Sequence, residues 1–351
     1  MNPLNNYQTL LSQYNKTKTE LKNKQKHLPT LRFVSFIVAA LFFYQFLTSY
    51  QNIYLAISIL LIITLIILSY FDLVLKNKIA KTEQFIKINE NEIEALKHNF
   101  SMFDGGLEFI NPEHPYSNDL DLFGLNSLFQ YINRTATIFG KKKLAHFFTN
   151  AIDIKEQISE RQAAISELAD NIDFRQKLQT IFFDQNPNES DFKELNAWLN
   201  HKSTIPQNRF IKPVMYSYIF ITVSCILLYF ARIVPYQIPL ILFLSQLLTN
   251  SLFLRFFIKS QNVVNAKYKI ISKYALCLQL IENTSFKSPL LFELNNSLNH
   301  KNTKPSIIIS KLAKIINWMD SNLNIAVAMI LNGTFLFSTL LTYKAENWKK
   351  N

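Results

Sequence analysis

One group of side chains in this sequence has the residue types of a metal site. His114 directly follows Glu113. Asp119 and Asp121 come a few residues later, and imidazole and carboxylate groups are common metal ligands. The spacing matches neither the H-E-x-x-H pattern of zinc sites nor an EF-hand loop, and Pro115 favours an extended segment. We therefore expect no metal here and interpret these polar groups as turn and cap residues.

Phosphate chemistry has one candidate segment. A P-loop needs G-x-x-x-x-G-K-[ST] so that backbone N–H groups can cradle phosphates. Around the single Gly-Lys pair, Thr135 replaces the first glycine and Lys142 replaces the hydroxyl residue. The remaining hypothesis is a phosphate contact from a basic triplet at the start of a helix, with a solvated helix face as the alternative. The triplet is Lys141, Lys142 and Lys143.

Other catalytic patterns are missing from the sequence. With five glycines in 351 residues, the chain has no dinucleotide-binding fingerprint. It has no G-x-S-x-G motif, and no nucleophile stands beside a histidine. Cys225 and Cys277 lie in an apolar run and in a helical pattern, which fits neither a disulfide framework nor a metal site. We expect a non-catalytic chain with no catalytic residue, bound metal or cofactor of its own.

Two apolar runs near the N-terminus predict a membrane hairpin. The segments 33–47 and 53–71 are joined by the uncharged linker 48–52, and the second holds twelve Leu or Ile residues in nineteen. Those twelve favour insertion by roughly 4–7 kcal/mol, and about 20 residues cross the hydrocarbon. Basic residues flank the pair on both sides, so the positive-inside rule places both ends in the cytoplasm.

A second pair of apolar runs predicts the same topology. The segments 214–231 and 238–254 are separated by Pro235 and followed by Arg255. Polar residues weaken the second run, so a buried hairpin in a soluble core is the alternative. A fifth run, 325–343, is interrupted by Asn332, Gly333 and Thr334. A fifth span would carry the basic C-terminus outside, so we interpret this run as a core helix.

The parts outside the apolar runs also have helical periodicity, which predicts an all-α chain with little sheet. The helix after the first hairpin should continue to Phe100 and pair with the N-terminal helix as a stalk, until Asp104-Gly105-Gly106 interrupts it. The net charge of +12 is uneven: residues 1–32 carry +5 and residues 255–351 carry +9. Basic regions beside apolar runs indicate first a membrane surface and second nucleic acid.

An ordered series of short motifs links residues 104 to 168. Its signature positions are His114, Pro115, Tyr116, Asp119, Asp121, Phe123, Gly124, Gly140 and Arg161. The series resembles the start of the core, or lever, domain of the MutS DNA mismatch-repair family. It is more similar to membrane-anchored MutS-like proteins of bacteria. Weaker similarity near Asn332 and Glu346 extends the resemblance to about two-thirds of the chain.

The resemblance implies a domain order. It runs as 1–100 for the N-terminal helix, first hairpin and stalk, 101–212 for the first part of a helical lever domain, 213–258 for the second hairpin, and 259–351 for a lever-like return segment. In this interpretation the signature residues define the fold. Asp119 and Asp121 are caps and turn formers, Gly124 and Gly140 are tight backbone positions, and Leu128 and Phe129 are core residues.

The resemblance also implies partners. The family connects DNA contacts to a C-terminal ATPase that dimerises, whereas this sequence ends near the point where that ATPase would begin and has Lys142 where arginine is usual. We expect a multi-pass protein of the inner membrane with its soluble parts in the cytoplasm. Its expected partners are the lipid bilayer, duplex DNA, a separately encoded MutS-type ATPase that would bring ATP, and a second copy. The alternative is a membrane scaffold that binds proteins without nucleic acid.

Overall fold

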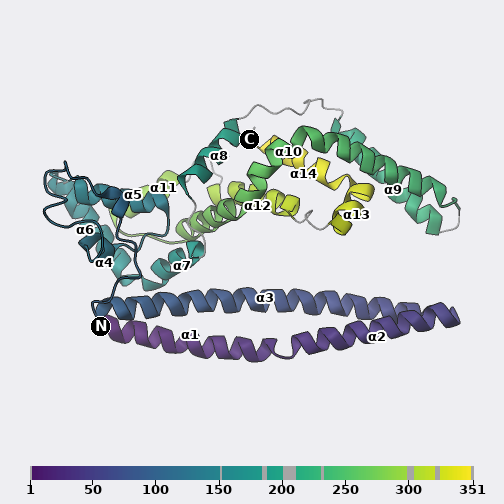
Figure 1. Ribbon diagram of the computed structural model, residues 1–351, viewed down its shortest axis with the longest axis horizontal. Helices are drawn as coiled ribbons and strands as arrows, with labels where there is room; N and C mark the ends of the chain where they lie inside the picture. The colour runs from purple at the N-terminus through teal and green to yellow at the C-terminus, as the bar shows by residue number, and fades with distance from the viewer. Residues whose placement is uncertain are drawn as a thin grey trace. The chain divides into compact units, whose positions relative to one another are not determined.

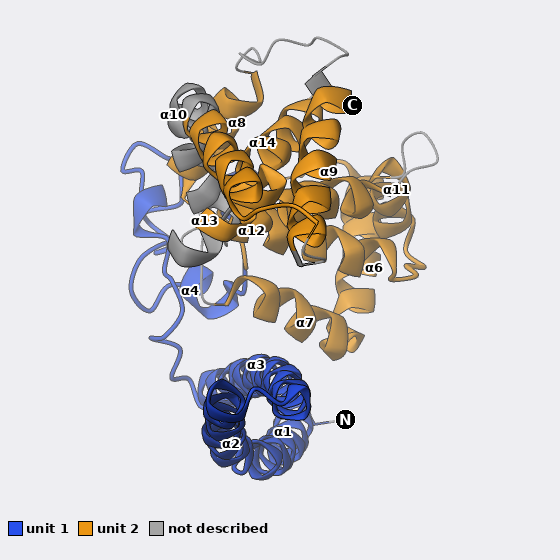
Figure 2. Ribbon diagram, turned by 90° about the vertical axis from the view of Figure 1, so that its right-hand side faces the viewer, with its two compact units in different colours: residues 1–135, 139–151 blue, residues 136–138, 152–351 orange. Residues whose placement is uncertain are grey.

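The regular elements of the computed structural model are helices (Figure 1). It describes residues 2–150, 152–183, 188–200, 211–230, 233–298, 304–320 and 325–348, and no strand occurs in these ranges. The prediction of an all-helical chain is therefore confirmed. The chain divides into two compact units, residues 1–135 with 139–151 and residues 136–138 with 152–351 (Figure 2).

The first unit contains a long helical hairpin followed by a loop-rich segment. Its elements are α1 (Pro3–Gln25), α2 (Leu28–Ser49), α3 (Asn52–Leu96), the 3₁₀ helix η1 (Leu107–Phe109), α4 (Leu128–Ile132) and α5 (Ile138–Thr149). Helices α1 and α2 both pack along α3. The helix was predicted to continue to Phe100, but α3 ends at Leu96. His98 has a left-handed backbone, φ 64°, which does not continue the helix.

Small residues bring α2 and α3 together. The Ser58 hydroxyl donates to the Ala39 carbonyl at 3.2 Å, and both residues are buried. Small side chains at a helix pair allow close backbone approach, which is typical of helices packed in membranes. Tyr50 closes the turn between the helices with a left-handed backbone, φ 56°, and its N–H donates to the Phe46 carbonyl.

The base of the hairpin is joined by one buried carboxylate. Asp72 directly follows the predicted span 53–71 and is 2% exposed. It accepts hydrogen bonds from Gln25 at 2.9 Å and from Arg32 at 3.0 Å, and it pairs with Lys76. The hydrogen bond from Gln25, then that from Lys76, and the nearby positive charges lower the Asp72 pKa against the opposing effect of burial. Asp72 therefore connects α1, α2 and α3 at one point.

Below this point α1 and α3 form the expected stalk. Tyr14 stacks on Phe85 with ring centroids 4.8 Å apart, and Lys18 pairs with Glu83 at 2.9 Å. The apolar face of α3 in this part, which includes Ile79 and Ile86, is buried. The heptad-like spacing of these residues explains why the sequence indicated an amphipathic helix here and a uniformly apolar one before it.

The second unit is a helical assembly around one long helix. Its elements are α6 (Lys155–Asp170), α7 (Ile172–Phe182), α8 (Glu189–Asn200), α9 (Ile211–Phe230), α10 (Gln237–Glu282), α11 (Pro289–Leu298), α12 (Pro305–Asp320), α13 (Ile325–Phe335) and α14 (Phe337–Trp348). Helix α10 contacts α7, α8, α9 and α11 to α14. Trp198, Ile271, Leu312 and Ile316 form its main apolar core.

Two glutamates join helix starts in this unit. The Glu167 carboxylate accepts the backbone N–H groups of Ser288 and Lys287, both at 2.7 Å, and these bonds lower the Glu167 pKa. Glu282 accepts the Ser306 N–H at 2.9 Å. The first N–H groups of a helix have no partner inside the helix, so each carboxylate satisfies donors that the helix itself leaves free.

By length and composition, three helical stretches in the described part of the chain are long and apolar enough to cross a membrane: Pro3–Ser49, Asn52–Leu96 and Lys212–Tyr229. They contain the predicted spans 33–47 and 53–71 and nearly all of 214–231. The predicted span 238–254 lies on α10, and the side chains of 252–254 lie outside the described residues. On α9, Phe220 and Leu227 are 73% and 64% exposed, and the choice between a membrane hairpin and a buried soluble hairpin stays a prediction.

The polar residues that weakened the predicted span 238–254 face other helices of this unit. Gln246 is fully buried between Thr222 of α9 and α13, where one orientation of its amide donates to the Gly333 and Thr334 carbonyls at 3.0 and 3.1 Å. The Thr339 hydroxyl donates to Asn250 at 2.7 Å. Hydrogen bonds of this kind hold helices together where water is excluded.

The run 325–343 is divided into two short helices. Leu336 has a left-handed backbone, φ 47°, between α13 and α14. The Ser338 N–H then donates to the Asn332 side chain at 2.8 Å, which caps the second helix. The run expected to be a core helix is therefore two helices, with the Asn332 side chain capping the second. Several residues of α14, including Leu341 and Ala345, are buried in the unit's core.

We predict that Asp72→Asn destabilises the full chain in detergent by about 1.5–3 kcal/mol at pH 7, the usual size for hydrogen bonds to a charged group. Because folding lowers the Asp72 pKa, the charged form stabilises the fold above the ordinary value near 4, and this stabilisation is lost as the pH falls through the lowered native pKa. The difference between variant and parent should therefore shrink on acidification.

Thermal unfolding of both proteins between pH 7 and pH 3 measures this difference. Glu83→Gln is the matched control, because Glu83 pairs at the exposed stalk surface and such pairs contribute at most about 1 kcal/mol. Equal melting temperatures for Asp72→Asn and its parent at pH 7 would contradict the assignment.

We also predict that Gly333→Ala destabilises the second unit by about 1–3 kcal/mol, the usual cost of overpacking. A Cβ at Gly333 would lie 2.2 Å from the ring of Phe243 on α10. Phe243→Ala removes that ring, so the double variant should be less destabilised than the sum of the single variants. Thermal unfolding of the four proteins gives the coupling energy, and a coupling near zero would refute the contact.

Candidate functional site

Glycines fix the backbone of the signature segment, residues 103–149, which lies in the first unit except for 136–138. The Gly124 N–H donates to the Gly105 carbonyl at 2.8 Å. A Cβ on Gly105 would lie 2.2 Å from the Gly124 oxygen, and Gly106 and Gly124 have φ values of +69° and +112°. Side chains disfavour such backbones. The interpretation of Gly124 as a tight position fits this geometry, whereas Gly140 lies in the first turn of α5.

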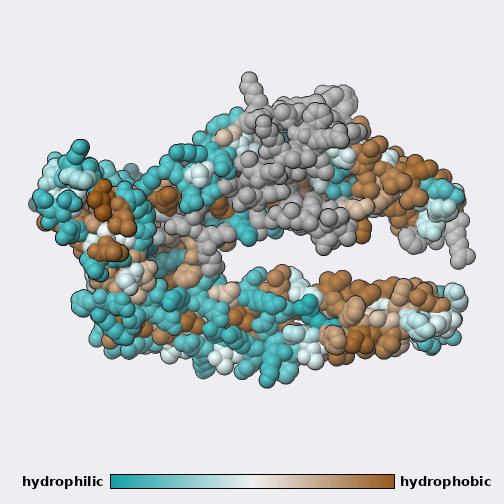
Figure 3. Space-filling view, in the orientation of Figure 1, coloured by the Kyte–Doolittle hydropathy of each residue, from teal (hydrophilic) through white to brown (hydrophobic). Residues whose placement is uncertain are grey.

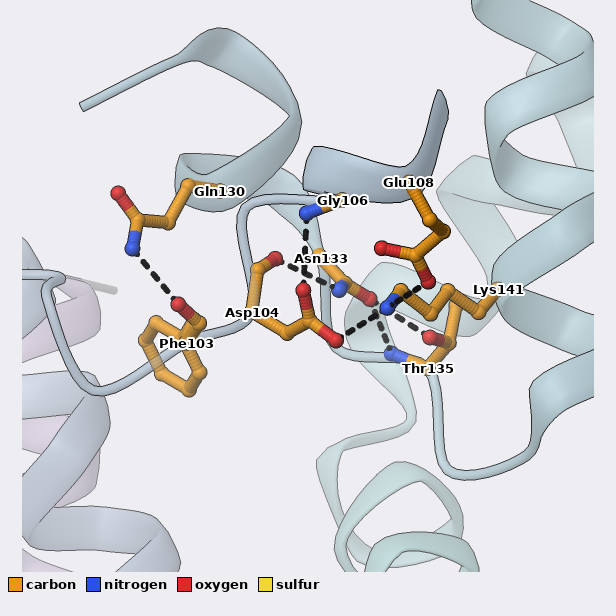
Figure 4. Close-up of polar contacts among 8 residues, drawn as sticks. All are labelled: Phe103, Asp104, Gly106, Glu108, Gln130, Asn133, Thr135 and Lys141. Carbon is orange, nitrogen blue, oxygen red and sulfur yellow. Dashed lines mark hydrogen bonds and ion pairs between the residues drawn. The ribbon is translucent and has the colours of Figure 1, made fainter. Parts of the chain in front are cut away.

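Side-chain amides connect the loops of this segment (Figure 4). Asn133 donates to the Asp104 carbonyl at 2.9 Å and accepts from the Thr135 N–H at 3.0 Å. Gln130 donates to the Phe103 carbonyl at 2.7 Å and accepts the Asn126 N–H at the same distance. Both amides are buried. These side-chain hydrogen bonds hold the loop backbone in place, as backbone hydrogen bonds between strands would in a sheet. The segment therefore has a defined fold without strands.

The first lysine of the basic triplet belongs to this network. The Lys141 ammonium pairs with Asp104 and Glu108, and its side chain is 12% exposed. Burial alone would raise the Asp104 pKa, but the hydrogen bonds from Lys141 and Gly106 outweigh it and lower that pKa. Burial alone would lower the Lys141 pKa, and its two carboxylate partners raise it. Both groups are therefore charged at neutral pH.

This pairing bears on the predicted phosphate contact at Lys141, which stays a prediction. Its ammonium already has two carboxylate partners, so a phosphate would have to compete with them. Lys143 lies over the Phe147 ring at 5.1 Å and remains exposed, as does Lys142. A phosphate contact at these two lysines stays a prediction, and both lie on a solvent-exposed helix face.

His114 joins the loop to the end of α5. Its Nδ1 accepts the Ser117 N–H at 3.1 Å, and its Nε2 lies 3.1 Å from the Thr149 carbonyl. These partners fit the neutral ring with the proton on Nε2. The Tyr116 hydroxyl donates to the Phe148 carbonyl at 3.1 Å. Both ring nitrogens are therefore engaged in structural hydrogen bonds, and Pro115 between these two residues is exposed.

The nearby carboxylates behave differently from the expectation. Among the described residues, Asp119 and Asp121 accept no hydrogen bond through their side chains, so the predicted caps are not formed. Asp121 does form a turn with a left-handed backbone, φ 47°. No group of three or more His, Cys, Asp or Glu side chains in the described part of the chain is arranged to hold a metal.

An aromatic cluster fills the centre of the segment. Phe129 is fully buried and contacts Phe123, Phe109 and Phe148 with ring centroids 5.2–5.9 Å apart. The expected core position of Phe129 is confirmed. Leu128 is 48% exposed, so its assignment to the core was wrong. In a helix as short as α4, adjacent residues point in different directions, and only one of this pair reaches the cluster.

Sequence reasoning missed the residue that attaches this segment to the stalk. Arg134 forms a two-pronged pair with Glu92 of α3, with N–O distances of 2.6 and 3.2 Å. Its guanidinium also lies 3.4 Å from the centre of the Phe103 ring. Arg134 belongs to the motif series, but its partner lies 42 residues away, so no local pattern could identify it. Arg161 lies on α6 in the second unit.

These contacts give the segment a structural character. Its polar groups mostly bind one another, and the two free cysteines lie elsewhere, on α9 and α10. Burial raises the pKa of the Cys277 thiol to about 11, so it is protonated and unreactive at neutral pH. The hydrogen bonds, ion pairs and ring contacts of the segment hold its loops in place.

Comparisons with known proteins add no relative. No protein-family model, curated protein or solved structure matches the chain.

We predict that Gly105→Ala unfolds or loosens the signature segment, because the added Cβ would overlap the Gly124 carbonyl. The expected cost is about 1–3 kcal/mol. Leu125→Ala is the matched control in the same loop, since Leu125 is 80% exposed and should change stability by less than about 0.5 kcal/mol. Limited proteolysis of the full chain reports the difference, and equal cleavage rates for the two variants would contradict the packing described here.

Proposed function

We propose that this chain is a membrane-anchored, non-catalytic helical protein in which α2 and the first part of α3 cross the bilayer as a hairpin. The observation that carries the proposal is the exposure of apolar side chains around both helices. Phe33, Leu60 and Ile66 are 65%, 63% and 61% exposed, and hydrophobic surface covers this end of the hairpin (Figure 3). Soluble monomers rarely leave apolar patches of this extent in water.

The polar groups around the hairpin support the same placement. Ser58 is satisfied inside the helix pair, and the charges of Arg32, Asp72 and Lys76 gather at its base. Charged side chains are costly in hydrocarbon, so this cluster marks a boundary. Basic residues there support a cytoplasmic location for the stalk and the signature segment, by the positive-inside rule. In α9, exposed apolar residues such as Phe220 support a second crossing.

We further propose that the signature segment is the start of a MutS-type lever region. The glycine geometry and buried amides support a fold-defining role for its motif residues, as that resemblance implies. In this proposal the chain holds a lever-like helical part at the membrane for a separate ATPase subunit, duplex DNA or a second copy. The chain itself supplies no nucleotide chemistry.

A scaffold that binds proteins without nucleic acid is the second candidate. The ion pairs of Lys141 with Asp104 and Glu108 favour it, because a phosphate at this lysine would have to compete with two carboxylates. Electrostatic DNA binding depends steeply on salt, whereas a protein interface need not. Binding of a labelled 30-base-pair duplex at increasing salt therefore separates the two candidates.

We predict that the full chain remains in the membrane pellet after sodium carbonate extraction. Ile63→Arg with Ile66→Arg should weaken this retention, because each charge costs about 2.5–3.5 kcal/mol at the centre of a span. Both positions are exposed on α3. Asn77→Arg with Ala80→Arg is the control, since it adds the same charge to exposed stalk positions. Release of the parent chain into the soluble fraction would overturn the proposal.

A further inference from the structure

A cavity of about 430 Å³ lies among α9, α12 and α14 of the second unit. Four lysines line it: Lys212 from α9, Lys311 and Lys314 from α12, and Lys344 from α14. Its volume is in the range of small-molecule sites. Four ammonium groups around one cavity repel each other, so an anion inside it would be bound favourably.

The cavity has no counter-charge of its own in the described residues. No carboxylate is among its lining side chains, and none of the four lysines pairs with a described acidic residue. Glu346 of α14 is buried and is not part of the lining. This differs from Lys141 in the first unit, which two carboxylates already neutralise. The four lysines are therefore available to an external anion.

The remaining walls are aromatic and apolar. Tyr216, Tyr343 and Trp348 contribute rings with a polar edge, and Met215 and Ile315 contribute apolar surface. The Trp348 indole is held by a hydrogen bond to the Ile308 carbonyl at 3.0 Å. Tyrosine and tryptophan side chains prefer the interface between hydrocarbon and water. A ligand with a charged group and an apolar part matches both kinds of wall.

The cavity lies at the end of a candidate membrane span. The apolar stretch of α9 starts at Lys212, and the residues that follow, such as Val214 and Phe220, are 62% and 73% exposed. If α9 crosses the bilayer as proposed above, Lys212 and the cavity stand at the level of the lipid headgroups on the cytoplasmic side. Basic pockets at this level suit anionic phospholipid headgroups.

We propose that this cavity binds the phosphate headgroup of an anionic phospholipid. The lysines contact the phosphate, while the aromatic and apolar walls receive the glycerol and the first part of the acyl chains. The inference rests on the proposed membrane anchoring, and it gives the basic C-terminal region a lipid partner. A free phosphate has the same charge but no group for the apolar walls, and a duplex DNA is too wide to enter a cavity of this size.

The test is native mass spectrometry of the detergent-purified full chain with added phosphatidylglycerol or phosphatidylcholine. We expect retained phosphatidylglycerol on the parent chain and at least about tenfold weaker retention on Lys311→Gln/Lys314→Gln/Lys344→Gln, since each lysine near an anionic headgroup adds about 1 kcal/mol. Lys155→Gln/Lys287→Gln/Lys304→Gln is the matched control. It removes the same charge from exposed positions outside the cavity and should bind like the parent.

Competition separates the sources of the phosphate. Phosphatidylglycerol should persist in 10-fold excess inorganic phosphate and in the presence of a 30-base-pair duplex. Three results would overturn the inference. They are equal loss of phosphatidylglycerol from both triple variants, equal binding of phosphatidylcholine and phosphatidylglycerol to the parent chain, and displacement of phosphatidylglycerol by either competitor. Carbonate extraction of the same variants keeps the two proposals distinct. If the cavity variant stays in the membrane yet binds the lipid like the parent, the cavity assignment fails while the anchoring proposal stands.

Discussion

Exposed apolar side chains on the hairpin of the first unit impose the main constraint on this protein. Around α2 and the first part of α3, leucine, isoleucine and phenylalanine residues point outward as well as between the helices. The hydrophobic effect makes such a surface unstable in water. A bilayer removes that cost, and by length and composition both helical stretches, Pro3–Ser49 and Asn52–Leu96, could cross it.

The contacts of the polar groups near the apolar segments are explained by the same constraint, because each buried polar group needs a hydrogen-bond partner. Ser58 bonds across the hairpin, Asp72 gathers Gln25 and two cations at its base, and Gln246 bridges α9 and α13. A buried polar group without a partner is costly. Satisfied pairs instead fix which faces of the helices meet. Polar residues that weaken a hydropathy profile are thus the contacts that specify how the helices pack.

Local patterns predicted the elements well, because helical periodicity and apolar length act over a few turns. The helices and the pairing of α1 with α3 follow from such patterns, whereas the core position of Phe129 was implied by the family resemblance. Such patterns did not predict contacts between residues far apart in the chain. These contacts join Glu92 with Arg134, Gly333 with Phe243, and Lys141 with Asp104. The basic triplet indicated a phosphate site because its carboxylate partners are not its neighbours in sequence. The sequence also did not predict the cluster of cavity lysines, because they come from three different helices.

Spin-label accessibility in reconstituted bilayers tests the hairpin most directly. A nitroxide at residue 63 should be relaxed strongly by oxygen, which concentrates in hydrocarbon, and weakly by a water-soluble nickel complex. A nitroxide at residue 77, on the same helix beyond Asp72, should show the reverse. Strong relaxation of the label at residue 63 by the nickel complex would mean that the apolar half of α3 lies in water, and the account would be wrong.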